Sequence, residues 1–409
     1  MTSTWRRDWD VVIIGGGPGG SATATFLADA GFSVLVIDRD EFPRFHIGES
    51  LLPSGAEVLL KMGVEPSEEV FIHKRGAQFI CDATDRVAEF DFALALDGPP
   101  RHAWHVERAT FDKLLCDHAA SRGAEVRFGV RALDYQVDAD GVTIETDRGD
   151  LRARFMVDAS GQHRFIAKKK RSVVPYMDFG RASVFTHFHD VQQHAWDEIS
   201  PNNDIRIMMV KDGWMWVIPL PGRRLSIGLV SRRQGIRKEW LDEYIGHSKR
   251  IRRWIEGARR EDETHIIANF SYKNDASFGA RYACVGDASC FLDPVFSSGA
   301  NLALRSAYSM TGFLIDALRE EREDDPTLME AHAAHLQRAY DTFSSLIFRF
   351  YHTKIIDNLV FDVPEGGDLR ANITSVFTGD VFRYDNDFQE MLLKSRIRPK
   401  PGVSLLPKD

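Results

Sequence analysis

Three glycines near the start of the chain have the spacing of a dinucleotide-binding turn. Gly15, Gly17 and Gly20 form a G-x-G-x-x-G pattern, and Asp38 follows 18 residues after the last of them. In such a turn the first glycine permits a sharp bend, the second lets a pyrophosphate approach the backbone, and the third lets helix and strand pack closely. A carboxylate about 20 residues further on accepts hydrogen bonds from ribose hydroxyls. The spacing predicts a dinucleotide site without distinguishing FAD from NAD.

The segments around this turn have the order of a βαβ unit. Residues 11–14 and 34–37 are short apolar runs, which is typical of parallel strands buried on both faces. Residues 19–30 between them predict a helix whose N-terminal amides point at the phosphates. The alternative is a glycine-rich turn of some other α/β protein, and the complete order of elements argues against it.

Later segments return to this first domain and favour FAD. A helix is expected over 111–120, a strand over 124–128, and a further strand that ends at Asp158. Another strand leads into Asp287 and a helix that starts near Gly299. An acid after a strand suits a ribityl phosphate, and a fresh helix N-terminus suits an isoalloxazine oxygen. Asp287 alone is also compatible with a turn or an N-cap aspartate.

Six blocks of the sequence share one pattern of motifs. They are GGGPGG (15–20), HIGESLLPS (46–54), HKRGAQF (73–79), VERATFDKLL (106–115), WMWVIP (214–219) and GDASCFLDPVFSSG (286–299). Together they resemble the flavin-dependent monooxygenase fold and, within it, the flavin-dependent halogenases. The resemblance covers about residues 8–320, and the W-x-W-x-I-P block is its narrowest signature. It implies an enzyme that receives reduced FAD from a separate flavin reductase and uses O₂ with chloride or bromide to halogenate an aromatic ring.

Lys74 and two tryptophans are the residues to which the resemblance gives catalytic roles. The matching lysine receives hypohalous acid, either as a hydrogen-bonded acid or as an N-haloamine, and desolvation of the amine would lower its pKa and expose a lone pair. Trp214 and Trp216 would form a wall between the substrate and the flavin. Without this wall, the C4a-hydroperoxide of the flavin would hydroxylate the substrate. The alternatives are a solvated surface lysine and a strand whose alternating tryptophans are ordinary core.

The loop before the last predicted helix is the candidate halide site. Ser298 and Gly299 lie at a loop-to-helix junction, where free backbone N–H groups bind anions. Tryptophan-specific halogenases carry a glutamate before the Ser-Ser/Thr step, whereas this chain has Phe296. We therefore expect an electron-rich ring, a phenol or a pyrrole, that needs less help in losing its proton.

The remaining predicted contacts concern cofactor and substrate. Phe296 and His105 are expected to contact the substrate, and His187 and His189 are interpreted as structural, with no metal site. The predicted FAD contacts are Gly15, Gly17, Gly20, Asp38, Arg39, Ser50, Arg108, Asp287, Gly299 and Ala300.

Two basic runs lie on an otherwise acidic chain. The formal charge is 52 − 60 = −8, which argues against wholesale nucleic-acid binding. The runs at 168–171 and 249–260 are either solvated faces or a docking surface for an acidic carrier protein that bears the ring. No signal peptide or apolar run of membrane-spanning length is present, and the four cysteines lack metal-site spacing, so we expect a cytoplasmic protein with no membrane partner.

The whole chain is predicted to be an α/β protein with a Rossmann-type FAD-binding domain, interleaved with an antiparallel-sheet substrate domain and followed by helices. The FAD domain would use 8–72, 106–172 and 270–325, the substrate domain 73–105 and 173–269, and the helical region 326–409. Two other functions stay open on the sequence: an oxidoreductase of the geranylgeranyl-reductase kind or another flavin monooxygenase, and a non-catalytic flavin carrier.

Overall fold

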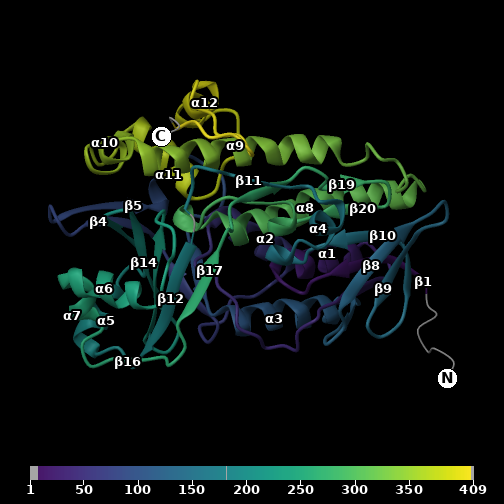
Figure 1. Ribbon diagram of the computed structural model, residues 1–409, viewed down its shortest axis with the longest axis horizontal. Helices are drawn as coiled ribbons and strands as arrows, with labels where there is room; N and C mark the ends of the chain where they lie inside the picture. The colour runs from purple at the N-terminus through teal and green to yellow at the C-terminus, as the bar shows by residue number, and fades with distance from the viewer. Residues whose placement is uncertain (1–7, 181, 407–409) are drawn as a thin grey trace.

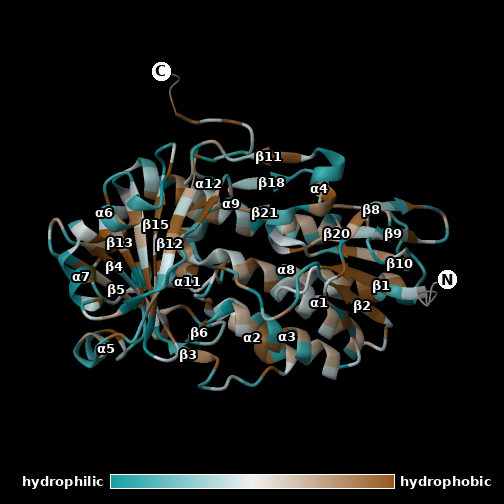
Figure 2. Ribbon diagram, turned by 60° about the horizontal axis from the view of Figure 1, so that its bottom comes forward, coloured by the Kyte–Doolittle hydropathy of each residue, from teal (hydrophilic) through white to brown (hydrophobic). Residues whose placement is uncertain are grey.

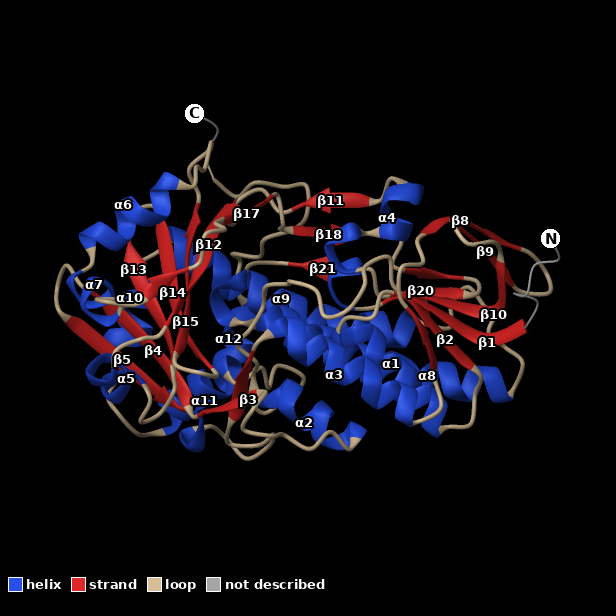
Figure 3. Cartoon of the chain, turned by 90° about the horizontal axis from the view of Figure 1, so that it is seen from below, coloured by secondary structure: helices blue, strands red, loops and turns tan. Residues whose placement is uncertain are grey.

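Two eight-stranded sheets lie at opposite ends of the molecule, with helices between them (Figure 3). The structure, a computed structural model, describes residues 8–180 and 182–406, apart from the side chains of residues 355 and 356. The predicted α/β class, a Rossmann-type sheet interleaved with an antiparallel sheet, is confirmed.

The first sheet has the order β19-β20-β10-β1-β2-β7, and its central strands are parallel. Strand β1 is buried from Val11 to Ile14, and strand β2 is buried over its whole length. Both are buried because helices cover both faces of the sheet. In Figure 2 these strands are largely brown, the colour of apolar residues. The strands are β1 (Asp8–Ile14), β2 (Val34–Ile37), β7 (Glu125–Arg127), β10 (Leu151–Asp158), β19 (Phe278–Gly279) and β20 (Tyr282–Cys284), extended by β8 (Ala132–Val137) and β9 (Val142–Thr146).

The helices of this half begin close to the predicted positions. The helix expected over 19–30 is α1 (Pro18–Asp29), and the one expected over 111–120 is α3, which starts three residues earlier. The C-terminal strand β20 pairs with β10 in parallel, so the chain returns to its first domain as predicted. The other helices are α2 (Pro53–Met62), α3 (Arg108–Ser121), α4 (Phe165–Lys170) and α8 (Ser298–Arg319).

The second sheet has the order β16-β12-β15-β14-β13-β4-β5, with β17 beside β12, and only its β13–β4 pair is parallel. One face packs on three short helices, and the other carries the two tryptophans of β14. The strands are β4 (Gly76–Cys81), β5 (Arg86–Asp91), β12 (Ala182–His189), β13 (Ile205–Val210), β14 (Gly213–Leu220), β15 (Arg224–Ser231), β16 (Arg259–Arg260) and β17 (His265–Ala268); the helices are α5 (Gln193–Ile199), α6 (Glu239–His247) and α7 (Lys249–Trp254).

Two small sheets connect these halves. Lys74 ends the first strand of a two-stranded sheet, opposite Ala103. That sheet consists of β3 (Phe71–Lys74) and β6 (Ala103–Val106), and the other of β11 (Val173–Pro175), β18 (Tyr272–Asn274) and β21 (Cys290–Phe291).

The C-terminal helices pack on the tryptophan face of the second sheet. Figure 1 shows α9 lying roughly along the long axis of the molecule, above α8. Phe343 and Phe377 of these helices share one apolar core with Phe79 and Trp214 of the sheet, so the region from 326 onward has no separate core of its own. The division of the chain into three domains stays a prediction. The helices are α9 (Glu330–His352), α10 (Ile355–Phe361), α11 (Asp368–Phe377) and α12 (Asp387–Lys394).

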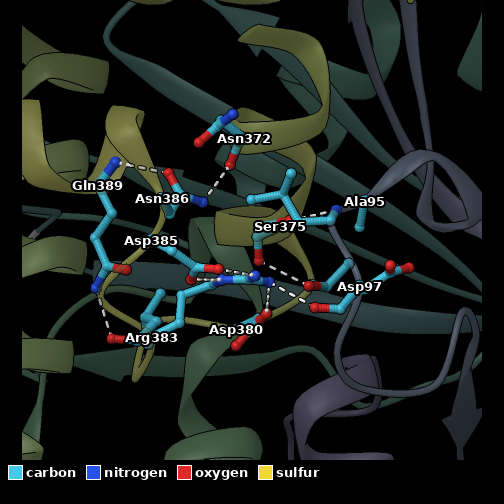
Figure 4. Close-up of polar contacts among 12 residues, drawn as sticks. Ala95, Asp97, Asn372, Ser375, Asp380, Arg383, Asp385, Asn386 and Gln389 are labelled. Atoms are coloured by element: carbon cyan, nitrogen blue, oxygen red, sulfur yellow. Dashed lines mark hydrogen bonds and ion pairs between the residues drawn. The ribbon is translucent and has the colours of Figure 1, made fainter. Parts of the chain in front are cut away.

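Polar contacts fix this region to the loop after β5 (Figure 4). The Leu96 amide donates to Ser375 Oγ at 2.8 Å, and Arg383 Nη1 donates to the carbonyl oxygen of Asp97 at 2.8 Å. Within the described residues, no helix combines the length and the apolar character needed to span a bilayer.

Candidate active site

A cavity of about 580 Å³ opens beyond the carboxyl ends of β1 and β2. This is where an open α/β sheet binds ligands, and the volume is that of a cofactor pocket. Of the ten predicted FAD contacts, all but Gly20 line the cavity. The structure therefore brings together residues that lie more than 280 positions apart in the sequence.

The glycine turn fits a pyrophosphate. A Cβ atom at Gly17 would have only Arg44 Nη2 within 4 Å, at 3.8 Å, so the space beside this backbone belongs to the cavity. A Cβ atom at Gly20 would instead lie 1.9 Å from the carbonyl oxygen of Gly15. The two positions therefore require glycine for different reasons: Gly17 leaves room for a ligand, and Gly20 allows helix and strand to pack closely.

Two of the acids that line the cavity, Asp38 and Asp287, are among the predicted FAD contacts. Asp38 accepts hydrogen bonds from the amides of Gly16 (2.8 Å) and Asp40 (3.0 Å), which fixes the turn. Burial raises the pKa of Asp287 to about 6, against the opposing charge of Arg108. Both carboxylates are placed to accept hydrogen bonds from hydroxyls of a flavin nucleotide.

Lys74 lies in a second, much smaller cavity of about 10 Å³, room for roughly one water-sized molecule. Its amine donates to Ser50 Oγ at 2.8 Å and to the carbonyl oxygen of Leu51 at 3.0 Å, and it is fully buried. Ser50 lines the flavin cavity, and Ile205 and Ser297 line both cavities. The two cavities are therefore adjacent, and the amine is one hydrogen bond from the flavin side.

Burial controls the charge of this amine. Loss of solvation lowers the pKa of Lys74 to about 7, and the nearby Asp204 carboxylate opposes the shift. A large share of the amine is therefore neutral near pH 7 and carries a free lone pair. The structure thus rules out the solvated surface lysine that the sequence left open.

Both tryptophans of β14 line the flavin cavity while belonging to the core of the sheet. Their ring centroids lie 5.9 Å apart. Trp216 Nε1 donates to Ser226 Oγ at 3.0 Å, and the ring lies where a Cβ atom of Gly228 would be, 2.3 Å from it. The tryptophans therefore belong to the core and also line the cavity, and their role as a wall between substrate and flavin stays a prediction.

A hydrogen-bonded chain fixes Trp214 to the C-terminal helix α9. Trp214 Nε1 donates to the Tyr351 hydroxyl at 3.0 Å, which donates to Asp293 Oδ2 at 2.9 Å. The same carboxylate accepts from the amides of Gly180 and Val295 at 3.1 and 3.0 Å. Burial raises the pKa of Asp293 to about 7, against these hydrogen bonds.

The loop before α8 differs in detail from the prediction. Gly299 lines the flavin cavity as predicted, whereas Ser298 does not line either cavity, and Ser297 lines both. Ser297 has a left-handed backbone (φ 53°) and precedes the first turn of α8, so it turns the chain toward the two cavities. Phe296 lies in the Lys74 cavity, stacked on Phe377 with ring centroids 5.4 Å apart.

Three histidines predicted from the sequence have defined positions. His105 is fully buried with Nε2 2.7 Å from the carbonyl oxygen of Asn203, and it lines neither cavity, so the structure does not bring it to a substrate. His187 and His189 contact the same carboxylate, that of Glu261. Among the residues that the structure describes, no cluster of three His, Cys, Asp or Glu side chains is suited to a metal ion.

Four residues around the site were missed by sequence reasoning. Asp293 belongs to the quoted GDASCFLDPVFSSG block, so its position carried a signal that was not used. Asp204, Tyr351 and Phe377 lie in segments without a motif, and only the tertiary structure places them beside Lys74 or Trp214.

Comparison with known proteins decides the family. The family model described as tryptophan halogenase matches residues 10–97 and 94–361. The chain belongs to the flavin-dependent halogenase family. As a flavin-dependent halogenase it is an enzyme that uses FAD and a halide, which confirms the prediction and disfavours the lipid-reductase and flavin-carrier alternatives.

Relatives of this halogenase include two carrier-protein halogenases. It is 28% identical to a 1H-pyrrole-2-carbonyl-[peptidyl-carrier protein] chlorinase of Pseudomonas fluorescens, over 92% of this chain and 90% of the relative. It is 31% identical to a 1H-pyrrole-2-carbonyl-[peptidyl-carrier protein] brominase of Pseudoalteromonas luteoviolacea, over 73% and 75%. Its structure is similar to that of a flavoprotein/dehydrogenase from Cytophaga hutchinsonii, with TM-score 0.85, 28% identity and coverage of 95% and 96%.

The glycine turn yields a first prediction. Gly17→Val should abolish FAD binding, because the side chain fills the cavity, while the thermal midpoint of the flavin-free protein changes by less than about 2 °C. Gly20→Ala should lower that midpoint, because its Cβ atom meets the Gly15 carbonyl. Flavin titration and thermal unfolding measure both variants, and wild-type FAD affinity in Gly17→Val would contradict this account of the turn.

The buried amine yields a second prediction, on stability. Lys74→Met should raise the free energy of unfolding by about 1–4 kcal/mol at pH 6, because the folded wild-type protein there holds a poorly solvated ammonium. The pKa of Lys74 is about 7 in the folded chain and higher in the unfolded chain. Between these two pKa values the unfolded wild-type chain binds more protons, so the wild-type protein becomes more stable as pH rises. The stability gained by Lys74→Met must therefore shrink as pH rises toward 10. Urea unfolding at pH 6 and pH 9.5 measures this, and a gain that does not depend on pH would contradict the burial of a titrating amine.

Proposed function

We propose that Lys74 receives an oxidised halogen made at the flavin and delivers it to a pyrrole or phenol ring. The observation that carries this proposal is the position of the amine, buried in a small cavity that shares Ile205 and Ser297 with the flavin cavity. When bound and reduced, the flavin supplies hypohalous acid from O₂ and halide.

The two tryptophans select what passes between the cavities. Trp214 and Trp216 are bulky, buried and fixed by hydrogen bonds to Tyr351 and Ser226. A wall of this kind admits hypohalous acid, which is nearly as small as water, and keeps an aromatic ring away from the flavin. The amides of Ser298 and Gly299 in the first turn of the long helix α8 offer N–H groups for the halide, whereas the Ser297 amide already donates to the Pro294 carbonyl oxygen.

Lys74 has two balanced ways to use hypohalous acid. As a hydrogen-bond donor it holds and polarises HOX, and the ring then takes X⁺ and loses a proton to the departing hydroxide. As a neutral amine it gives R–NH₂ + HOX → R–NHX + H₂O, and then R–NHX + ArH → R–NH₂ + ArX. A pKa of about 7 makes both protonation states accessible.

The ring that this chain accepts is inferred from the relatives and from Phe296. Two relatives act on pyrrole-2-carbonyl groups attached to a peptidyl carrier protein, which supports a carrier-tethered pyrrole here. Phe296 offers no carboxylate to remove the ring proton, which suits an electron-rich ring. The Lys74 cavity is too small for a pyrrole, so the ring must displace Phe296 or Phe377 as it binds.

The partners in this proposal are a flavin reductase, as the source of reduced FAD, and an acidic carrier protein. The structure weakens one of the two predicted docking runs, because arginines of 249–260 already form ion pairs with acids of the same chain. These arginines are Arg250, Arg253, Arg259 and Arg260. The run at 168–171 is the better docking candidate, although Lys169 pairs with Asp134.

The central prediction separates flavin chemistry from halogen delivery. Lys74→Ala should leave FAD binding and the oxidation of reduced flavin by O₂ intact, because the amine does not line the flavin cavity. Halogenated product should fall at least a hundredfold, because hypohalous acid is no longer held or aimed. Stopped-flow flavin oxidation and product analysis with pyrrole-2-carbonyl carrier protein measure the two steps separately.

Trp216→Ala serves as the matched comparison. It should also retain flavin oxidation, but with a breached wall it should release more hydrogen peroxide or hydroxylated product than Lys74→Ala. If Lys74→Ala keeps a tenth of wild-type halogenation, a loss of only about 1.4 kcal/mol of transition-state stabilisation, Lys74 is not the delivering residue.

A further inference from the structure

Glu49 is a buried acid of the flavin cavity that the proposed mechanism has not used. Its side chain is 2% exposed and lines the cavity. Its Oε2 atom has no hydrogen-bond partner among the residues that the structure describes. Burying a carboxylate oxygen without a partner is costly, so its position calls for an explanation.

The other oxygen of Glu49 begins a chain that leads to the surface. Oε1 lies 2.6 Å from Nε2 of His187, which is buried on β12. Nδ1 of the same ring lies 3.2 Å from Oε2 of Glu261, whose side chain is 41% exposed. One imidazole therefore connects a carboxylate in the flavin cavity with a carboxylate in contact with solvent.

Halogenation requires such a connection because it consumes a proton. The balanced reaction is FADH₂ + O₂ + X⁻ + H⁺ + ArH → FAD + ArX + 2 H₂O. Without halide, the oxidation of reduced flavin, FADH₂ + O₂ → FAD + H₂O₂, consumes none. For either ionisation state of the reduced flavin, the halide-dependent reaction therefore consumes one proton more than halide-free oxidation, and it consumes that proton in a cavity walled by Trp214 and Trp216.

We propose that Glu261, His187 and Glu49 form a proton relay from solvent to the flavin cavity, a proposal that rests on the halogenation proposed above. Glu261 gives a proton to Nδ1 of His187 as Nε2 gives one to Glu49, and Glu49 gives its proton to the oxygen that leaves as water. The exposed carboxylate of Glu261 takes up the next proton from solvent. Flipping of the imidazole ring restores the starting tautomer.

The charges around His187 suit this role. Burial lowers the pKa of the ring, but the carboxylates of Glu49 and Glu261 outweigh burial, so the net pKa lies above the ordinary value. An imidazole with a raised pKa stays able to donate a proton at neutral pH. The other charged or titratable groups near this chain are His189, His265, Arg108 and the ion pair of Glu107 with Arg224.

His187→Gln tests the relay, because glutamine keeps hydrogen-bonding capacity on both sides but cannot carry a proton. In this variant, FAD affinity and halide-free oxidation of reduced flavin should equal those of the wild type. The halide-dependent turnover number should fall at least tenfold at pH 7.5, with a steeper loss as pH rises. An unchanged turnover number and pH profile would overturn the proposal, and an equal loss in halide-free oxidation would overturn it too, because that reaction does not consume the additional proton of the halide-dependent reaction.

His189→Gln is the matched control. His189 lies two residues away on the same strand and also contacts Glu261, at 3.4 Å, but it does not reach Glu49. Its turnover and pH profile should stay those of the wild type. A tenfold loss in this variant would show that any change near Glu261 is harmful and would overturn the specific role of His187.

Titration of the flavin-free protein tests the same contacts without turnover. By NMR of labelled histidines, the pKa of His187 should lie above 6.5 in the wild type and should fall by about one unit or more in Glu49→Gln. An unchanged pKa would overturn the coupling between the two groups. The outcome of this titration does not depend on the proposed function. The proposed function would be contradicted by a different result, namely that the wild-type protein makes no halogenated product.

Discussion

The burial of the Lys74 amine is the constraint on which the site depends. A lysine without exposure loses the hydration of its charge, and here only Ser50 and the carbonyl oxygen of Leu51 replace it by hydrogen bonds. The segment 46–54, which supplies both partners, also supplies Ser50 and Glu49 to the flavin cavity. The same short segment thus sets the distance between the flavin and the amine.

The remaining walls of the site come from parts of the chain that are far apart. The loop before α8 contributes Ser297 to both cavities, and α11 contributes Phe377 to the cavity of Lys74. Through Tyr351 and Asp293, helix α9 holds Trp214 at the flavin cavity. The C-terminal helices are therefore part of the site, which explains why they share an apolar core with the second sheet.

Local sequence determined what could be predicted. The glycine turn and strand β2 follow from short patterns, because each depends on neighbours in the sequence. The return of β20 to the first sheet pairs Met156 with Tyr282, and it was predicted from the strand, acid and helix pattern around Asp287 rather than from a local contact. The helices covering Trp214 and the contact of Phe296 with Phe377 depend on partners more than 80 residues away, and no local pattern reveals them. His105 was expected to contact the substrate, but its ring is buried beside the carbonyl oxygen of Asn203 and lines neither cavity.

The tail shows the same limit. From their composition, with several prolines and charged residues, residues 395–409 are expected to be poorly ordered, and residues 407–409 lie outside the described residues. That expectation is wrong for Ser404 and Leu405, which donate hydrogen bonds to the two carboxylate oxygens of Asp178, at 2.6 and 2.7 Å. Asp178, a buried acid that is distant in the sequence, thus fixes the position of this part of the tail.

The claim that Lys74 retains the oxidised halogen is tested most directly by changing the order of addition. The enzyme is mixed with reduced FAD, O₂ and chloride in the absence of aromatic substrate, the flavin is allowed to oxidise fully, and free flavin and small oxidants are removed by rapid filtration. Pyrrole-2-carbonyl carrier protein is then added. The account predicts up to one halogenated product per enzyme from the wild type and none from Lys74→Ala, whereas equal product from both proteins would contradict it.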